Sequence, residues 1–325
     1  MARTDAADRR ACDESERYLS RPGAGAYVLM TAARNEAATI ERTMRAVIEQ
    51  TVRPRRWVVV SDGSTDQTDG LVATYASRHG FMRLLRRSGD HNRNFGSKVN
   101  AIRDGITRDL CDVEYKFIGV LDADITVSQD YYEKLLMRFR DNPLLGIGGG
   151  KIWDVVKGEA INGRGSLNSV GSAVQMFRRT CYEEIGGYLP LEVGGEDAAA
   201  EVMARSHGWQ VRSFEDLPVL HHRRTGTATK SIWHARFERG IEDYLLGAHP
   251  LFFLAKCLGR IAEGPYLVGG LLMGLGYLWS ALCRTRREVP REFIDYLRKE
   301  QKARLFSYVP RVWPRGRGRF NGGRG

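Results

Sequence analysis

Two aspartates, Asp122 and Asp124, directly follow the apolar run 115–121 and are separated by one alanine. Side chains alternate between the two faces of an extended chain, so both carboxylates point to the same side. Carboxylate oxygens are the ligands that hard divalent cations such as Mg²⁺ and Mn²⁺ take in proteins. A cation bridging a diphosphate stabilises its departure by roughly several kcal/mol. A solvated acidic loop is the alternative, but the preceding apolar run and a second acidic loop upstream favour a metal site.

That upstream loop begins at Asp62, which ends the apolar run 56–61 and is followed by Gly63. A carboxylate here can accept a hydrogen bond from the N–H of a nucleotide base, and glycine lets a ligand approach the backbone. An ordinary Asp-Gly turn is the competing interpretation. Asp66, further along the loop, is expected to cap the following helix.

Two adjacent acids, Glu196 and Asp197, stand at the predicted start of a helix and follow Gly194 and Gly195. The helix dipole stabilises acids at a helix N-terminus, which is the purely structural interpretation. The functional interpretation is that one of them removes a proton from an acceptor hydroxyl, which requires hydrogen-bonding distance. Glu196 and Asp197 are therefore the two candidates for a general base.

Four cationic or potentially cationic residues follow a short apolar run in the second half of the chain: His221, His222, Arg223 and Arg224. Arginine holds phosphate groups, and imidazole is a ligand for divalent metals. We expect His222 to complete the metal site and the other three to contact the diphosphate or the acceptor. A solvated basic turn is the alternative. Two weaker phosphate candidates, Lys98 and Arg93, lie in a Gly/Asn-rich segment.

Apolar runs alternate with helical periodicity in the first half of the chain. Strands are expected at 26–31, 56–61, 81–85 and 115–121, with helices at 40–48, 67–78 and 96–106. The second half is less regular; strands are expected at 146–153, 171–178, 211–214 and 217–220, with helices at 182–185 and 198–207. Such alternation is typical of an α/β fold with a mostly parallel sheet flanked by helices. Ligands bind beyond the carboxyl ends of its strands, where Asp62 and Asp122 fall.

Taken in order, these residues resemble the family 2 glycosyltransferases, which have the GT-A fold, and in particular bacterial polysaccharide and glycolipid-type transferases. Five segments carry the resemblance: Arg34-Asn35-Glu36, the run Val58–Asp66, Asp122-Ala123-Asp124, Phe177-Arg178-Arg179 with Ile185–Tyr188, and Gly195-Glu196-Asp197. Their shared order gives a stronger signal than any one of them. Two departures stand out. Ser61 precedes Asp62 where many members have a second acid, and the Gln-x-x-Arg-Trp signature of processive synthases is absent, which favours transfer of a single sugar.

The resemblance implies an inverting, metal-dependent glycosyltransferase of the hexosyl type. Its donor would be a nucleotide-diphosphate sugar, with a UDP-sugar favoured, and its cofactor Mg²⁺ or Mn²⁺. It assigns nucleotide binding to Ala32, Arg34, Glu36, Asp62, Lys98 and Asp122. Asp122 and Asp124 would hold the metal. Asp197 would be the catalytic base, with Glu196 as the alternative.

An uncharged segment, 265–283, lies near the C-terminus; as a helix it would be roughly 28 Å long, against about 30 Å for a bilayer core. Residues 284–325 hold 13 Lys/Arg against 4 Asp/Glu, whereas the remainder holds 37 against 35. Each basic residue beside anionic headgroups contributes about 1 kcal/mol. A single span would place this basic end outside, against the positive-inside preference. We therefore expect peripheral, re-entrant or hairpin attachment at the cytoplasmic side of the cell membrane. A buried helix of a soluble domain is the alternative.

Four regions are predicted: a disordered lead 1–25, a GT-A catalytic domain 26–240, a helical membrane-associating region 241–310 and a disordered Arg/Gly tail 311–325. The predicted acceptor is a hydroxyl of a membrane-proximal glycan, lipid-linked or free, on an anionic membrane surface. A polyprenyl-phosphate glycosyl synthase is the nearest alternative. A nucleic-acid-binding protein is a distant one, because the near-neutral body lacks a basic face with interleaved aromatics, and no nucleic-acid partner is expected.

Overall fold

The computed structural model describes residues 25–88, 95–156, 159–161, 166–192, 194–222, 232–260, 268–287 and 289–308. The chain divides into two compact units after Ala235. The predicted lead, except for Gly25, and the predicted Arg/Gly tail lie outside the described residues, as do Arg93, Arg223 and Arg224.

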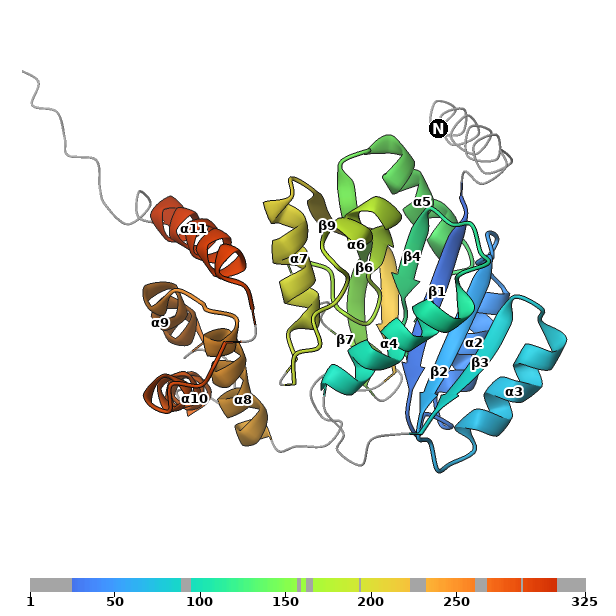
Figure 1. Ribbon diagram of the computed structural model, residues 1–325, viewed down its shortest axis with the longest axis horizontal. Coiled ribbons are helices and arrows are strands. Elements are labelled where there is room, and N and C mark those ends of the chain that lie inside the picture. The colour runs from blue at the N-terminus through green and yellow to red at the C-terminus, as the bar shows by residue number, and fades with distance from the viewer. Residues whose placement is uncertain are drawn as a thin grey trace, which may run out of the picture. The chain divides into compact units, whose positions relative to one another are not determined.

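The N-terminal half forms a parallel βα arrangement (Figure 1). Its strands are β1 (Tyr27–Ala33), β2 (Arg56–Asp62), β3 (Met82–Arg87) and β4 (Phe117–Val120), in the order β3-β2-β1-β4. Its helices are α2 (Ile40–Ile48), α3 (Thr68–Arg78) and α4 (Phe95–Asp109). β1, β2 and β4 are almost entirely buried, which explains why their sequences are mostly apolar. The strands and helices predicted here are confirmed, with ends shifted by a few residues.

The sheet continues through strands from the second half of the chain, which include β5 (Ile125–Val127), β6 (Leu145–Val156), β7 (Glu159–Ile161), β8 (Met176–Arg178) and β9 (Gln210–His221). The order is β3-β2-β1-β4-β8-β6-β9-β5, with β7 beside β6. β8 is antiparallel to both β4 and β6, and β5 is antiparallel to β9. The prediction of a mostly parallel sheet is therefore wrong for this half, and the sheet is mixed.

Two predicted elements differ in extent. The strand predicted at 171–178 is reduced to β8, because residues 172–174 form a turn. The two short strands predicted at 211–214 and 217–220 are one strand, β9, whose pairing with β6 shifts between Phe214 and Pro218. Glu215 and Asp216 lie in this irregularity, between the two paired parts of the strand, and in the sequence they resemble a loop.

Helices pack on both faces of the sheet. α4 crosses β1 and β2 closely: a Cβ added at Gly105 would lie 2.1 Å from the Met30 side chain. The remaining helices of this unit are α5 (Tyr131–Asp141), α6 (Arg179–Glu184) and α7 (Glu196–Ser206). α7 places the predicted Glu196-Asp197 pair in its first turn.

The second unit contains α8 (Ile232–Leu245), most of which belongs to it, α9 (Pro250–Gly259), α10 (Val268–Leu282) and α11 (Arg291–Tyr308). α8 and α10 make close backbone contact: a Cβ added at Gly276 would lie 2.1 Å from the Phe237 carbonyl oxygen. Tyr277 stacks on Phe253 of α9 with ring centroids 4.3 Å apart. Among the described residues, none of the helices has the length and apolar character needed to cross a membrane.

Candidate functional site

Two loops at the carboxyl ends of β1 and β2 are joined by hydrogen bonds. Asn35 adopts left-handed backbone geometry (φ 57°), and its side-chain oxygen accepts the Thr65 N–H at 2.8 Å. Glu36 N–H donates to the Thr68 hydroxyl at 2.8 Å. Asp66 accepts the N–H of Thr68 at 2.9 Å, which fits the predicted capping role at the start of α3. The two loops that were predicted to receive a nucleotide thus form one connected surface.

Asp62 lies buried at the end of β2, and its carboxylate contacts Arg87 Nη1 at 3.0 Å. Arg87 ends β3 and also contacts Asp104 of α4 through Nε at 2.6 Å. One guanidinium therefore fixes Asp62 from the neighbouring strand. The sequence analysis did not identify Arg87 or Asp104, because their proximity depends on the pairing of β2 with β3.

Lys98 is the cation nearest the predicted metal-binding motif. Its Nζ lies 2.7 Å from Asp122 Oδ1, and the amine is largely enclosed. Burial alone would lower the pKa of Lys98, but the negative charges of Asp122, Glu196 and Asp197 together raise it above its ordinary value. The ammonium form is therefore retained. The structure brings together residues predicted separately for the nucleotide, the metal and the base.

Glu196 is buried beside this lysine. Its pKa is raised, first by loss of hydration and then by the charges of Asp197 and Asp122, whereas Lys98 opposes the rise. The chain reaches it through Gly194 and Gly195, which have φ angles of 93° and 90°. These angles lie in the left-handed region that favours glycine, so the glycine pair shapes the entry into α7.

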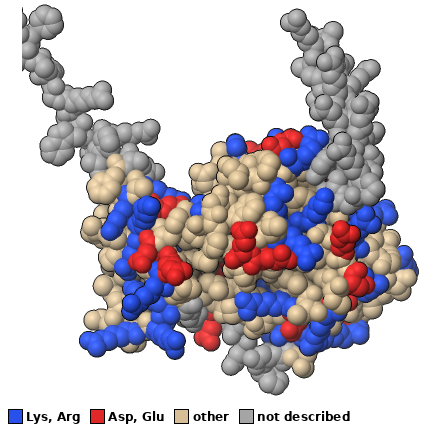
Figure 2. Space-filling model, turned by 45° about the horizontal axis from the view of Figure 1, so that its top comes forward, with Lys and Arg blue, Asp and Glu red and all other residues tan. Residues whose placement is uncertain are grey.

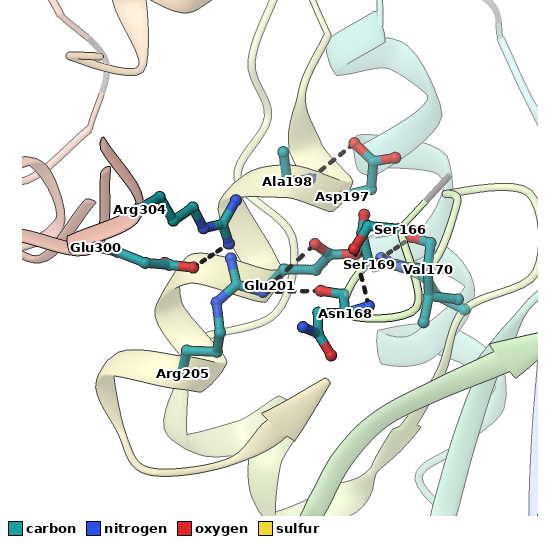
Figure 3. A network of polar contacts seen from close by, with 11 residues as sticks. Ser166, Asn168, Ser169, Val170, Asp197, Ala198, Glu201, Arg205, Glu300 and Arg304 are labelled. Carbon is teal, nitrogen blue, oxygen red and sulfur yellow. Dashed lines mark hydrogen bonds and ion pairs between the residues drawn. The ribbon is translucent and has the colours of Figure 1, made fainter. Parts of the chain in front are cut away.

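Asp197 is held by backbone groups. Oδ1 accepts the N–H of Ala198 at 2.8 Å, and Oδ2 accepts the N–H of Ser172 at 3.1 Å. One turn later on α7, the buried Glu201 accepts the N–H of Val170 at 2.6 Å and the Ser169 hydroxyl at 3.1 Å (Figure 3). Asp197 and Glu201 thus bind one segment of chain, 169–172, against the first turns of the helix.

Arg205 completes this network (Figure 3). Its Nη1 lies 3.6 Å from Glu201 Oε2 and donates to the carbonyl oxygen of Asn168 at 3.4 Å. Burial raises the pKa of Glu201 to about 7, although the Val170 N–H, Arg205 and the Ser169 hydroxyl oppose the rise. Sequence reasoning missed Glu201; the signal available was its i+4 spacing from Asp197, which puts both on one helix face.

His221, the last residue of β9, lies between two acids. Its Nε2 is 3.3 Å from Asp124 Oδ2, and its Nδ1 is 3.1 Å from Asp154 Oδ1 on β6. Burial lowers the pKa of His221, but the two carboxylates more than offset this and raise it. His222 instead faces Thr126, with Nε2 and the hydroxyl 2.8 Å apart. The imidazole adjoining Asp124 is therefore that of His221, whereas the metal role was predicted for His222.

The donors needed for a hard divalent cation are of the right type here. Asp122, Asp124 and His221 offer two carboxylates and an imidazole. Asp124 is buried with its carboxylate against His221, and Asp122 is half-buried against Lys98. Within the described part of the chain, three His, Cys, Asp or Glu residues are not preassembled around one point. The donor types fit a hard divalent cation, which Asp122, Asp124 and His221 would hold.

Residues 29–179 match the model of Glycosyl transferase family 2. A poly-beta-1,6-N-acetyl-D-glucosamine synthase of Staphylococcus aureus (strain COL) is 24% identical over 209 residues, which cover 58% of this chain and 48% of that protein. The chain spans about half the length of the curated relatives it matches.

Two solved structures share the fold. A mannosyltransferase from Pyrobaculum calidifontis, in complex with GDP-Man and Mn²⁺, is similar with a TM-score of 0.51 and 16% identity, covering 92% of this chain and 93% of that one. GalNAc-T7 with UDP, GalNAc and Mn²⁺ gives a TM-score of 0.55 and 14% identity, covering 88% and 58%. The mixed sheet with flanking helices is thus a GT-A-like α/β fold.

Proposed function

We propose that this chain, whose residues 29–179 match the model of Glycosyl transferase family 2, moves a hexosyl group from a nucleotide-diphosphate sugar to a hydroxyl of a glycan acceptor. The observation that carries this proposal is the convergence of Lys98, Asp122, Glu196 and Asp197 at the carboxyl end of the parallel strands. A cation for a diphosphate and a carboxylate for a hydroxyl proton lie in one place there.

In the proposed reaction Asp197 accepts the proton of the acceptor hydroxyl. The oxygen attacks the anomeric carbon, the bond from that carbon to the phosphate oxygen breaks, and the diphosphate leaves with the electron pair. The configuration at the anomeric carbon is thereby inverted. Asp197 is better oriented for this role than Glu196, because two backbone N–H groups fix its carboxylate. Glu196 is buried against Lys98, where its raised pKa disfavours the charged form.

A UDP-sugar is the donor that we propose. Its support is the UDP bound to GalNAc-T7 and the N-acetylglucosamine product in the name of the staphylococcal relative, although the mannosyltransferase holds GDP-Man. The base would lie on the surface formed by the joined loops after β1 and β2, near Ala32, Arg34, Glu36 and Asp62. Arg87, which fixes Asp62, would help to orient it for a base N–H.

Mg²⁺ or Mn²⁺ is the proposed cofactor, held by Asp122 and Asp124 with His221 beside them. The cation would neutralise charge that develops on the leaving diphosphate. Lys98 would then be free to contact the same diphosphate. We place the acceptor and the enzyme at the cytoplasmic side of a membrane, on the grounds of charge and apolar segment given by the sequence.

Calorimetric titration of nucleoside diphosphates, with and without Mn²⁺, tests this proposal. UDP should bind in a metal-dependent manner to the wild type and at least about tenfold more weakly to Asp122→Asn and Asp124→Asn, since each loses a charge facing the metal. Asp295→Asn, which changes an exposed aspartate of α11, is the matched control and should bind UDP as the wild type does. If no nucleotide binds under any condition, the proposed function is wrong.

The rival acceptor is a polyprenyl phosphate, which is already ionised and needs no base. Asp197→Asn separates the two. With a hydroxyl acceptor, kcat should fall by roughly 10²–10⁴-fold while UDP binding is retained. A kcat within a few fold of the wild type would favour the phosphate acceptor and refute the role given to Asp197.

A further inference from the structure

The second unit exposes large apolar side chains on the outward faces of two helices, α9 and α10. On α9 they are Leu251, Leu254 and Leu258, and on α10 Val268, Leu271, Leu275, Leu278, Trp279 and Leu282. Their exposed fractions run from 39% to 80%. The α10 leucines follow a spacing of three and four residues, which places them on one side of the helix. Soluble monomers seldom expose so many large apolar side chains on two helices that contact each other.

The inward face of α10 has the opposite composition. Its buried residues are mainly small or polar and include Gly269, Gly270, Gly276 and Ser280. The close approach of α8 and α10 requires a glycine on each helix. A Cβ at Gly240 of α8 would lie 2.0 Å from the Met273 carbonyl oxygen, and a Cβ at Gly276 of α10 would lie 2.1 Å from the Phe237 carbonyl oxygen. Helices packed through small residues, with leucine facing outward, are typical of helices whose solvent is lipid. A water-facing helix has the reverse distribution.

Basic residues border this surface. Between 246 and 287 the sequence has five Lys/Arg and one acid, Glu263. Arg284 and Arg286 are exposed directly after α10. Arg284 has φ 50°, a left-handed angle that favours glycine, just after the C-terminal end of α10. Cations beside an apolar face match the headgroups of anionic lipids, whereas a second copy of the same surface would bring like charges together.

We propose that the outward face of α9 and α10 docks on an anionic lipid bilayer, with the leucines entering the acyl boundary and the neighbouring arginines contacting headgroups. This inference deepens the membrane placement of the proposed function and does not depend on the transfer chemistry. It specifies which surface contacts lipid, and its basis is the position of the exposed side chains on α9 and α10.

Co-sedimentation of the full chain with sucrose-loaded vesicles tests it. The wild type should bind vesicles of phosphatidylcholine with phosphatidylglycerol, and should bind pure phosphatidylcholine more weakly. The triple variant Leu271→Gln/Leu275→Gln/Leu278→Gln changes exposed positions only, and each substitution should lower the partition constant by up to about tenfold. The matched control is Leu144→Gln/Leu167→Gln, which changes equally exposed leucines of the first unit and should bind as the wild type does.

Arg284→Gln/Arg286→Gln should reduce the preference for anionic vesicles by about fivefold for each lost charge and leave the binding to neutral vesicles unchanged. Absence of vesicle binding by the wild type would refute the inference, as would a triple variant that sediments like the wild type. Light scattering without lipid tests whether a second copy of the chain covers this surface instead. A dimer that the triple variant loses, with vesicle binding unchanged, would mean that the surface serves a second copy. UDP titration on the same samples reports the proposed function separately.

Discussion

The buried carboxyl group of Glu201 should make the unfolding free energy of the chain depend on pH. Its pKa is about 7 in the folded chain, against an ordinary value of 4.5, because burial disfavours the carboxylate. Between pH 4.5 and 7 the folded state holds this proton while the unfolded state has released it. The stability present below pH 4.5 is therefore lost as the pH rises through 7. With 1.36 kcal/mol for each pH unit, the loss is about 3 kcal/mol as an order of magnitude.

Glu201→Gln removes this ionisation, and its amide oxygen can still accept the Val170 N–H. We expect the variant and the wild type to have similar unfolding free energies at pH 4.5, and the variant to be more stable by about 2–3 kcal/mol at pH 8. Urea unfolding followed by tryptophan fluorescence at both pH values measures the difference. Glu192→Gln, at an exposed position, should leave the wild-type profile unchanged. A Glu201→Gln variant whose stability varies with pH as in the wild type would refute the reasoning.

Three further predictions concern the site. Lys98→Met should weaken UDP binding at least about tenfold by calorimetry, because a diphosphate loses a charge-assisted contact, whereas Lys134→Met on the exposed face of α5 should not. Gly195→Ala should lower the unfolding free energy by about 1–2 kcal/mol because alanine is strained at φ 90°, while Gly70→Ala within α3 should raise it or leave it unchanged in the same thermal melts. Asp154→Asn should weaken Mn²⁺ binding about 10–100-fold by calorimetry if His221 is a ligand, since Asp154 orients that imidazole; unchanged affinity would exclude it.

The nucleic-acid alternative has little support on the face drawn in Figure 2, where acidic side chains gather among the basic ones. A nucleic-acid-binding face would present a stripe of basic side chains. This face therefore gives no support to that interpretation.

The first half of the fold was predictable because its strands are buried on both faces. A strand such as β2 is then mostly apolar, and its run Trp57–Val60 is visible without any knowledge of the neighbouring strands. The antiparallel direction of β8 was not predictable. It is three residues long, and its direction depends on its placement between β4 and β6, which no local pattern records.

The choice between His221 and His222 shows a second limit. Adjacent residues of a strand face opposite sides, so the side that each histidine faces depends on the register of β9. That register shifts at Gly150/Lys151, in the middle of the pairing with β6. Simple alternation counted from the start of β9 therefore does not decide which imidazole meets Asp124. Asp62 and Asp122 lack this ambiguity, because each ends a mostly apolar run that is visible in the sequence.

The hydrogen bond from segment 169–172 to Asp197 could not be predicted from the sequence, although the helix that carries Asp197 was predicted. Val170 and Ser172 are two residues apart, and two residues of chain span up to about 7 Å. Their acceptors Glu201 and Asp197 are four residues apart on a helix, a rise of about 6 Å. The two spacings match only because residues 169–172 run antiparallel to α7 at this point. Each pattern is ordinary by itself, and the geometry around Asp197 arises from their tertiary register.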